Sequence, residues 1–182
     1  MSKTVLVYAC RHTKPGVSNE RFDWLSSLIY DVRPDYVVDL GDGPDMTSLN
    51  SYDTTKPEAL VVQNYEADIE VEKDAQERIR HRVKKAKVRR PAYFGIQGNH
   101  EYRINKALEH NPRMQGLKHG ISFSHLETKR FFDEYHPYEN NAPAIARYDG
   151  VDYSHYLGSG NYGTAMSGEH HGYNMLKKRL RS

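Results

Sequence analysis

The sequence predicts an α/β fold in which helices alternate with the strands of a largely parallel sheet. Three observations predict this class. Short β-branched or aromatic runs lie at residues 4–9, 36–40 and 92–97, helical patterns separate them, and a glycine followed by polar residues ends the second and third runs. The chain has 182 residues, so we expect one domain over residues 1–182.

The composition limits the class of protein. Mean hydropathy is −0.84 and 37% of residues are apolar, so we expect a lean core. No apolar run approaches the ~20 residues that span a bilayer, and we expect no membrane partner. The single cysteine, Cys10, argues against a disulfide framework and fits a reducing cytoplasm. A net charge of +2 does not suit a general trap for polyanions.

The first strand, residues 4–9, leads into a loop and then to Ser18, a residue type that favours helix N-caps. The helix that follows ends at Pro34, which cannot continue it, and residues 36–40 form the second strand. Apolar residues at helical spacing predict the buried face of this helix: Phe22, Leu25, Leu28 and Ile29.

A polar loop at residues 45–55 precedes one long helix at residues 57–87. The first half of this helix is acidic and the second half is basic, which suits the helix dipole. The third strand, residues 92–97, follows the helix. The thin apolar stripe of the helix comprises Val62, Tyr65, Ile69, Gln76, Ile79 and Val83.

The pattern after the third strand is less regular. In chain order we expect a short helix at residues 102–109, a loop at 110–124, a helix at 126–135, and a hairpin of strands at 144–148 and 151–155. The hairpin is predicted because Asp149 and Gly150 form a pair of residues that favours a tight turn between strands.

Two segments share one design, in which a strand, a glycine and metal-seeking side chains follow one another. Residues 37–45 are Val-Val-Asp-Leu-Gly-Asp-Gly-Pro-Asp, and residues 95–101 are Gly-Ile-Gln-Gly-Asn-His-Glu. Because parallel strands end at one edge of a sheet, Asp42, Asn99 and His100 can converge there. Carboxylate, amide and imidazole ligands together suit a divalent cation such as Mn, Fe or Zn.

These motifs resemble those of the calcineurin-like metallophosphoesterases. That family has, in order, Asp-x-His, Gly-Asp-x-x-Asp, Gly-Asn-His-Asp/Glu, a lone later histidine and Gly-His-x-His. Residues 41–45 match the second motif, residues 98–101 match the third, and His155 resembles the lone histidine. The long second helix and the Tyr-Ser-His-Tyr segment around His155 look most like phage-type members. The resemblance implies a metallophosphatase-type β-sandwich flanked by helices.

The resemblance also implies an activity, the hydrolysis of a phosphate mono- or diester by metal-activated water. Manganese is the expected cofactor, with Zn, Fe and Ni as alternatives. The family makes Asp42 the ligand that bridges two metal ions and Asn99 a ligand of one of them. His100 is implied to be the general acid, because an imidazole titrates near neutral pH.

Two acidic residues beside these motifs have alternatives that the sequence leaves open. Asp45 matches the second aspartate of Gly-Asp-x-x-Asp, a catalytic support that holds His12 or His100 in one tautomer, but a plain turn carboxylate fits equally. Glu101 either orients His100 or begins the next helix.

The first motif departs from the family pattern. His12 matches its histidine, but Cys10 stands where the family has a metal-binding aspartate. A thiolate binds softer metals such as Zn, and a buried inert cysteine is the alternative. One metal position then keeps His12 and Asp42. The other keeps Asp42, Asn99 and His155, and we expect it to be the better occupied of the two.

The last motif, Gly-His-x-His, does not occur in the sequence. The Gly-Glu-His-His segment at residues 168–171 opens an amphipathic segment at residues 173–180 instead. We therefore expect the amino-terminal part of a metallophosphoesterase, truncated naturally or by an incomplete reading frame. Its second sheet should be incomplete and its hydrolysis low or undetectable, and a complementing chain or an oligomer could supply the rest.

The basic cluster at residues 78–90 has two interpretations. It is the solvated end of an amphipathic helix, or it contacts phosphate groups. The second interpretation defines a rival function, a catalytically silent nucleic-acid-binding module. The expected partner of the enzyme is a phosphoester substrate, with a nucleic acid or a nucleotide among the alternatives, and the sequence does not identify which one. The expected location is the cytoplasm, or the host cytoplasm if a phage encodes the chain.

Overall fold

A four-stranded parallel sheet forms the centre of the computed structural model, with strand order β1-β2-β3-β4. The structure describes residues 3–50, 58–116, 120–159 and 164–165. The strands are Val5–Tyr8 (β1), Tyr36–Asp39 (β2), Ala92–Ile96 (β3) and Glu134–His136 (β4). The predicted α/β class, with a parallel sheet, is therefore confirmed.

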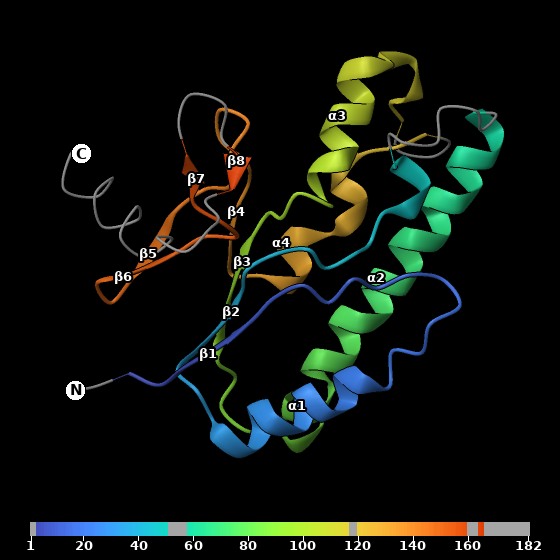
Figure 1. Cartoon of the computed structure of the whole chain (residues 1–182). Coiled ribbons are helices and arrows are strands. Elements are labelled where there is room, and N and C mark those ends of the chain that lie inside the picture. Colours follow the sequence, from blue (N-terminus) through green and yellow to red (C-terminus); the bar gives the residue numbers. More distant parts are fainter. Residues whose placement is uncertain (1–2, 51–57, 117–119, 160–163, 166–182) are drawn as a thin grey trace.

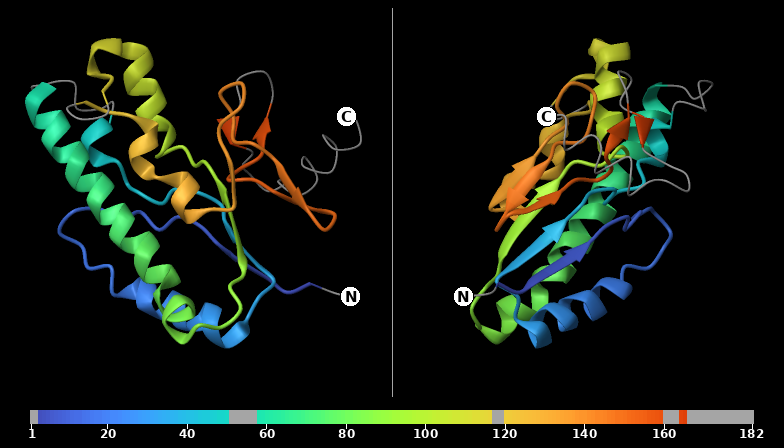
Figure 2. Two further views of the ribbon diagram at one scale, coloured as in Figure 1. Left: turned by 180° about the vertical axis from the view of Figure 1, so that it is seen from behind. Right: turned by 60° about the vertical axis from the view of Figure 1, so that its left-hand side comes forward.

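Two helices cover one face of this sheet, as Figures 1 and 2 show. They are α1 (Arg21–Val32) and α2 (Glu58–Ala86), which pack against each other. The core beneath them consists of Phe22, Ile29, Val37, Ala75, Ile79, Val83 and Tyr93. Of the predicted stripe on α2, all members within the described side chains are buried, whereas Val62 lies outside them.

The other face of the sheet carries a small hairpin of β5 (Ala146–Tyr148) and β6 (Val151–Tyr153). Its turn residues, Asp149 and Gly150, have φ of 48° and 78°, as a tight hairpin turn requires. Tyr148 stacks on Phe94 of β3 with 4.0 Å between ring centroids. The predicted hairpin is thus confirmed, and it forms a second layer over part of the sheet.

The predicted helix at residues 126–135 is wrong. A short 3₁₀ helix, Phe123–Leu126 (η3), and one turn of helix, Thr128–Phe131 (α4), are separated by Glu127 in a left-handed conformation, and the chain then enters β4. Asp133 explains the change. Its backbone N–H donates to the carbonyl of Tyr93, and its carboxylate accepts from the Tyr93 N–H at 2.8 Å, which draws the chain into the sheet.

Two details predicted for α1 are also wrong. The helix begins at Arg21, and Ser18 lies before it, where its hydroxyl accepts the N–H of Glu20, a residue that itself precedes the helix. Leu28 is 49% exposed, because α1 packs through Phe22, Ser26 and Ile29, with the Ser26 hydroxyl accepting the Arg82 N–H of α2.

The first helix after β3 is α3 (Tyr102–His110), which agrees closely with its predicted bounds of 102–109. Residues 110–124, predicted as loop, include the 3₁₀ turn Pro112–Met114 (η2), and a similar turn, Thr47–Leu49 (η1), follows β2. Two-residue strands, Gly158–Ser159 (β7) and Thr164–Ala165 (β8), pair after the hairpin. Residues 168–180 lie outside the described part of the chain.

A buried ion-pair network joins the loop after β1 to β2 and α2. Arg11 is only 8% exposed, and its guanidinium lies 2.9 Å from an Asp39 carboxylate oxygen and 2.7 Å from Glu72 Oε1. The Thr13 hydroxyl and the Gln76 amide also donate to Glu72. Because the two carboxylates are buried, Arg11 is the charge that makes their burial tolerable.

We predict that Arg11→Ala lowers the free energy of unfolding by about 3–5 kcal/mol, because Asp39 and Glu72 would remain buried without their counter-ion. The matched control is Arg78→Ala, which breaks surface pairs with Asp23 and Asp74 and should cost less than about 1 kcal/mol. Urea denaturation of the three proteins measures both changes. Equal decreases in the free energy of unfolding of the two variants would show that the buried network stabilises the protein no more than a surface ion pair does.

Candidate metal centre

Loops from four places in the chain meet at the edge of the sheet where β1, β2 and β3 end. The loop after β1 runs beside the loop after β2, with the Cys10 N–H donating to the Gly41 carbonyl at 2.9 Å and the His12 N–H to the Asp42 carbonyl at 3.1 Å. The loop after β3 and the turn after β6 complete the site. Together they supply the sequence-predicted residues Cys10, His12, Asp42, Asp45, Asn99, His100 and His155.

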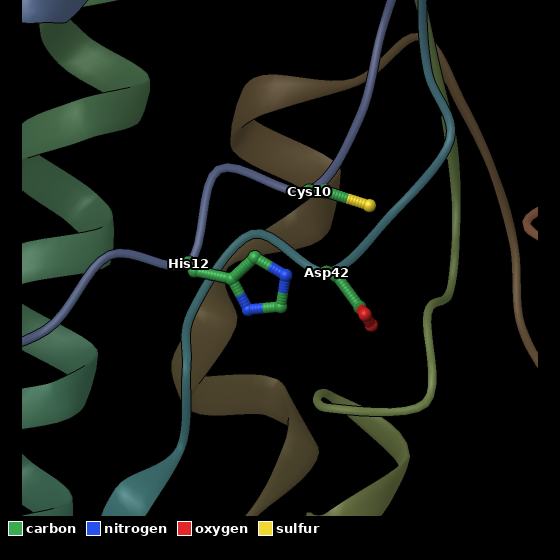
Figure 3. Close-up of side chains that lie close together, drawn as sticks. All are labelled: Cys10, His12 and Asp42. Carbon is green, nitrogen blue, oxygen red and sulfur yellow. The ribbon is translucent and has the colours of Figure 1, made fainter.

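Three of these residues have left-handed backbones. The φ angles are 52° at Cys10, 45° at His12 and 55° at Asp42. Each such non-glycine residue costs on the order of 1–2 kcal/mol, and strain of this kind clusters at functional sites. Figure 3 shows the three side chains directed toward one space. One ligand atom from each lies within 4.8 Å of the others, so the strained backbone produces a candidate group of metal ligands.

Two glycines allow the loops to come together. A Cβ added to Gly41, which has φ of 95°, would lie 2.4 Å from the Gly98 nitrogen, and one added to Gly98 would lie 2.2 Å from the Asp42 nitrogen. The backbones of the two motifs are therefore in direct contact. This contact places Asp42 beside Asn99, which directly follows Gly98.

Asp42, Asn99 and His155 form a second group. The His155 Nε2 atom lies 3.2 Å from Asp42 Oδ2 and 3.1 Å from Asn99 Oδ1. The other ring nitrogen, Nδ1, lies 2.8 Å from the Leu40 carbonyl, which only a protonated Nδ1 can contact favourably. His155 Nε2 then either carries a proton and donates to the two oxygens, or is unprotonated and can bind a metal ion together with them.

The electrostatics of this group follow from its contacts. Burial lowers the pKa of His155, but the hydrogen bond to Asp42, the Asp42 charge, the hydrogen bond to the Leu40 carbonyl and the Glu101 charge together raise the pKa above its ordinary value. Burial raises the pKa of Asp42, yet His155 and the His100 N–H together lower it. The prediction that His155 lies on a strand is wrong, because β6 ends at Tyr153 and His155 lies in the turn beyond it.

Asp45 lies between the two histidines that the sequence offered as its partners. Its Oδ1 atom is 3.1 Å from His100 Nδ1 and 3.5 Å from His12 Nδ1, and its carbonyl is 2.9 Å from His100 Nδ1. The His12 and His100 rings meet edge to face with 4.6 Å between centroids. Asp45, His12 and His100 therefore form a further group of candidate ligands.

Arg103 is a site residue that the sequence analysis missed. One guanidinium nitrogen lies 3.3 Å from His100 Nε2, and the other donates to the Asp45 carbonyl at 2.8 Å. Burial lowers the pKa of His100, and the Arg103 charge adds to this effect while Asp42 opposes it. His100 lies in the turn that leads into α3, and the Arg103 N–H donates to the His100 carbonyl at 3.1 Å, so the separation of three residues was the available signal.

Glu101 lies at the start of α3, which agrees with the prediction that it begins this helix. Its carboxylate also has a structural function that the sequence did not predict. The carboxylate accepts the N–H groups of Asp42 at 3.1 Å, Gly43 at 2.7 Å and Gly98 at 3.1 Å. Glu101 is 5% exposed, and this burial raises its pKa to about 8. Its carboxylate thus holds the loop after β2 and the loop after β3 together through their backbone N–H groups.

Cys10 is exposed, so the alternative of a buried inert cysteine is wrong. Partial burial raises the pKa of its thiol, and the nearby Asp42 carboxylate raises it further. Without a cation beside it, the thiol is therefore held in its protonated form. A bound metal ion of the softer kind, such as Zn, would lower the pKa of the thiol and take the thiolate as its ligand.

A scan against protein-family models found no match, and searches of curated proteins and of solved structures also found none. Within the described residues, no helix is long and apolar enough to cross a membrane. The fold and site therefore define an α/β protein with a candidate metal centre at the carboxyl edge of its sheet.

We predict that Glu101→Ala destabilises the protein by at least about 3 kcal/mol, because three buried N–H groups each lose their acceptor at roughly 1–3 kcal/mol. Glu101→Gln, which keeps one acceptor oxygen, should lose less. The exposed Glu109 of the same helix provides the control, and Glu109→Ala should stay within about 0.5 kcal/mol of the parent protein. Thermal and urea unfolding would contradict the clamp if Glu101→Ala were no more harmful than Glu109→Ala.

Proposed function

We propose that this chain is a metal-dependent phosphoesterase that hydrolyses a phosphate mono- or diester. The observation that supports it best is the meeting of Asp42, Asn99 and His155, where the imidazole Nε2 atom lies 3.2 Å or less from an oxygen of each of the other two residues. Oxygen and imidazole ligands of this kind suit Mn, Zn or Fe. The motif order in the sequence supports the same activity.

The proposed metal ligands fall into two sets that share Asp42. Asp42, Asn99 and His155 would hold one ion, for which we propose manganese. Cys10, His12 and Asp42 would hold a second, and the thiolate favours zinc there. Bound ions of this kind polarise phosphoryl oxygens and activate water. Asp42 suits the shared position because its carboxylate has two oxygens.

His100 is the proposed proton donor to the leaving oxygen. Asp45 accepts from Nδ1, which leaves Nε2 as the atom that faces the site, 3.9 Å from Asp42 Oδ2. Asp45 positions the ring, and its carboxylate stabilises the protonated imidazole. Arg103, next to Nε2, brings a positive charge to the place where a phosphate would lie.

The proposed fold is a metallophosphatase-type sandwich. Its support is the position of the β5–β6 hairpin, which lies on the sheet face opposite α1 and α2 (Figure 2) and contributes the turn that carries His155. Tyr148 anchors this layer on Phe94. The second layer thus delivers a ligand to the edge of the first.

We predict that the protein retains Mn or Zn after exposure to the ion and dialysis, and that Asp42→Ala lowers the retained metal at least about tenfold. Asp31→Ala removes an exposed carboxylate far from the site and should leave the metal content unchanged. Elemental analysis of the three proteins gives the result. Equal metal content in the parent and Asp42→Ala would exclude this metal centre.

The activity has its own test. With Mn present, the protein should hydrolyse both an activated aryl phosphodiester and an alkyl phosphodiester. His100→Ala should slow the alkyl substrate by about 100-fold or more and the aryl substrate far less, because only a poor leaving group needs a proton. His110→Ala, at the exposed end of α3, is the matched control. Absence of metal-dependent turnover in the parent protein would refute the proposed function.

A further inference from the structure

A second polar recess lies at the opposite edge of the sheet from the metal centre. It is bounded by the basic end of α2, the start of β3 and α4, and it encloses about 390 Å³. Figure 1 shows this end of α2 beside the beginning of β3, whereas the metal centre follows the ends of the strands. The cations that line this basic groove are Arg80, Lys84, Lys87, Arg90 and Arg130.

Arg80 is the most informative of them, because its charge has no carboxylate partner within the described residues. Its guanidinium donates to the carbonyl and side-chain oxygens of Gln76 and, through two nitrogens, to the Phe131 carbonyl. It also stacks on Tyr93 at 4.3 Å. All of these groups are neutral. Partly buried charge without a counter-ion is costly, and burial accordingly lowers the pKa of Arg80.

The other cations divide into two kinds. Arg90 pairs with Asp133 at 2.9 Å, and Arg130 pairs with Glu127 and with Glu77, the one carboxylate among the described residues that line the groove. Lys84 and Lys87 are exposed, and no carboxylate pairs with either side chain in the described part of the chain. A position near the carboxyl end of α2 explains the two lysines, and ion pairs explain Arg90 and Arg130, but neither explains Arg80. Three charges in the groove thus remain unneutralised.

The groove lining also limits what could bind. Tyr93 is 1% exposed and Phe131 is 2% exposed, so their rings are covered and offer no platform for a nucleobase. The volume lies in the range of small-ligand sites, which admits one or two nucleotides of a strand but no duplex. Arginines on one wall and lysines on the other suit a chain of phosphates between them.

We propose that the basic groove binds the phosphate backbone of a single-stranded nucleic acid without regard to sequence. The site is separate from the metal centre and does not depend on the proposed phosphoesterase activity. Its binding should therefore persist in EDTA and in Asp42→Ala. The groove extends the sequence-level interpretation of residues 78–90, because it adds Arg130 from α4 and assigns Arg80 to the buried wall.

The test uses a fluorescently labelled 20-mer of thymidine, with anisotropy measured in EDTA at several salt concentrations. Lys84→Glu/Lys87→Glu should weaken binding at least about tenfold and lower the slope of log K against log salt by about 1.4, at roughly 0.7 for each lost phosphate contact. The control, Lys14→Glu/Lys106→Glu, makes the same change in net charge at exposed positions outside the groove. It should change affinity by less than about twofold.

Several results would overturn the proposal. Equal weakening by the two double variants would assign binding to net charge rather than to the groove. Polyglutamate of matched length that displaces the oligonucleotide equally well would exclude a phosphate site. Tighter binding of a 20-base-pair duplex would exclude the single strand, and a strong preference between thymidine and adenosine 20-mers would exclude sequence-independent binding. Circular dichroism confirms that both double variants are folded.

Discussion

The Glu101 carboxylate is the interaction on which the candidate metal centre depends. It accepts three N–H groups from two loops that are 55 residues or more apart in sequence, those of Asp42, Gly43 and Gly98. Without it, two glycine-rich turns with few side chains of their own would have little to hold them together. Because the Glu101 carboxylate contacts only backbone N–H groups of these loops within the described residues, the side chains of Asp42 and Asn99 remain available to a ligand.

Arg11 does for the body of the protein what Glu101 does for the site. It is flanked in sequence by two candidate ligands, Cys10 and His12, but it points away from them into the interior. There it joins β2 to α2 through two carboxylates. The same short loop thus fixes the position of α2 on the sheet and presents ligands on the opposite side. Residues of the loop are alternately structural and exposed to the site.

The sequence predicted those features that depend on local pattern. The ends of β2 and β3, two residues before Gly41 and Gly98, followed from β-branched or aromatic runs that stop near a glycine, and the hairpin followed from Asp149 and Gly150. Features that depend on distant partners were missed or wrong. The clamp by Glu101 needs N–H groups from another strand end, and the position of β4 beside β3 is supported by hydrogen bonds between Asp133 and Tyr93.

The position of His155 also could not be predicted from the local sequence pattern. Its pairing with Asp42 was anticipated only through the motif order of a resembling family, since a single histidine 113 residues further along the chain gives no local signal. Its conformation was predicted as strand because the alternation around it fits one. The side chain nevertheless reaches the site from a turn, anchored by the Leu40 carbonyl.

Gln76 has a consequence for the protein as a whole. Its side chain donates to Glu72, a member of the Arg11 network, and accepts from Arg80 in the basic groove. One amide group is therefore shared between the two ends of the molecule, and it cannot satisfy one neighbour better without affecting the other. If an anion draws Arg80 away from Gln76, the hydrogen bond between Gln76 and Glu72 changes as well. By linkage, a ligand whose affinity the anion changes through the Arg11 network must in turn change the affinity for the anion by the same factor.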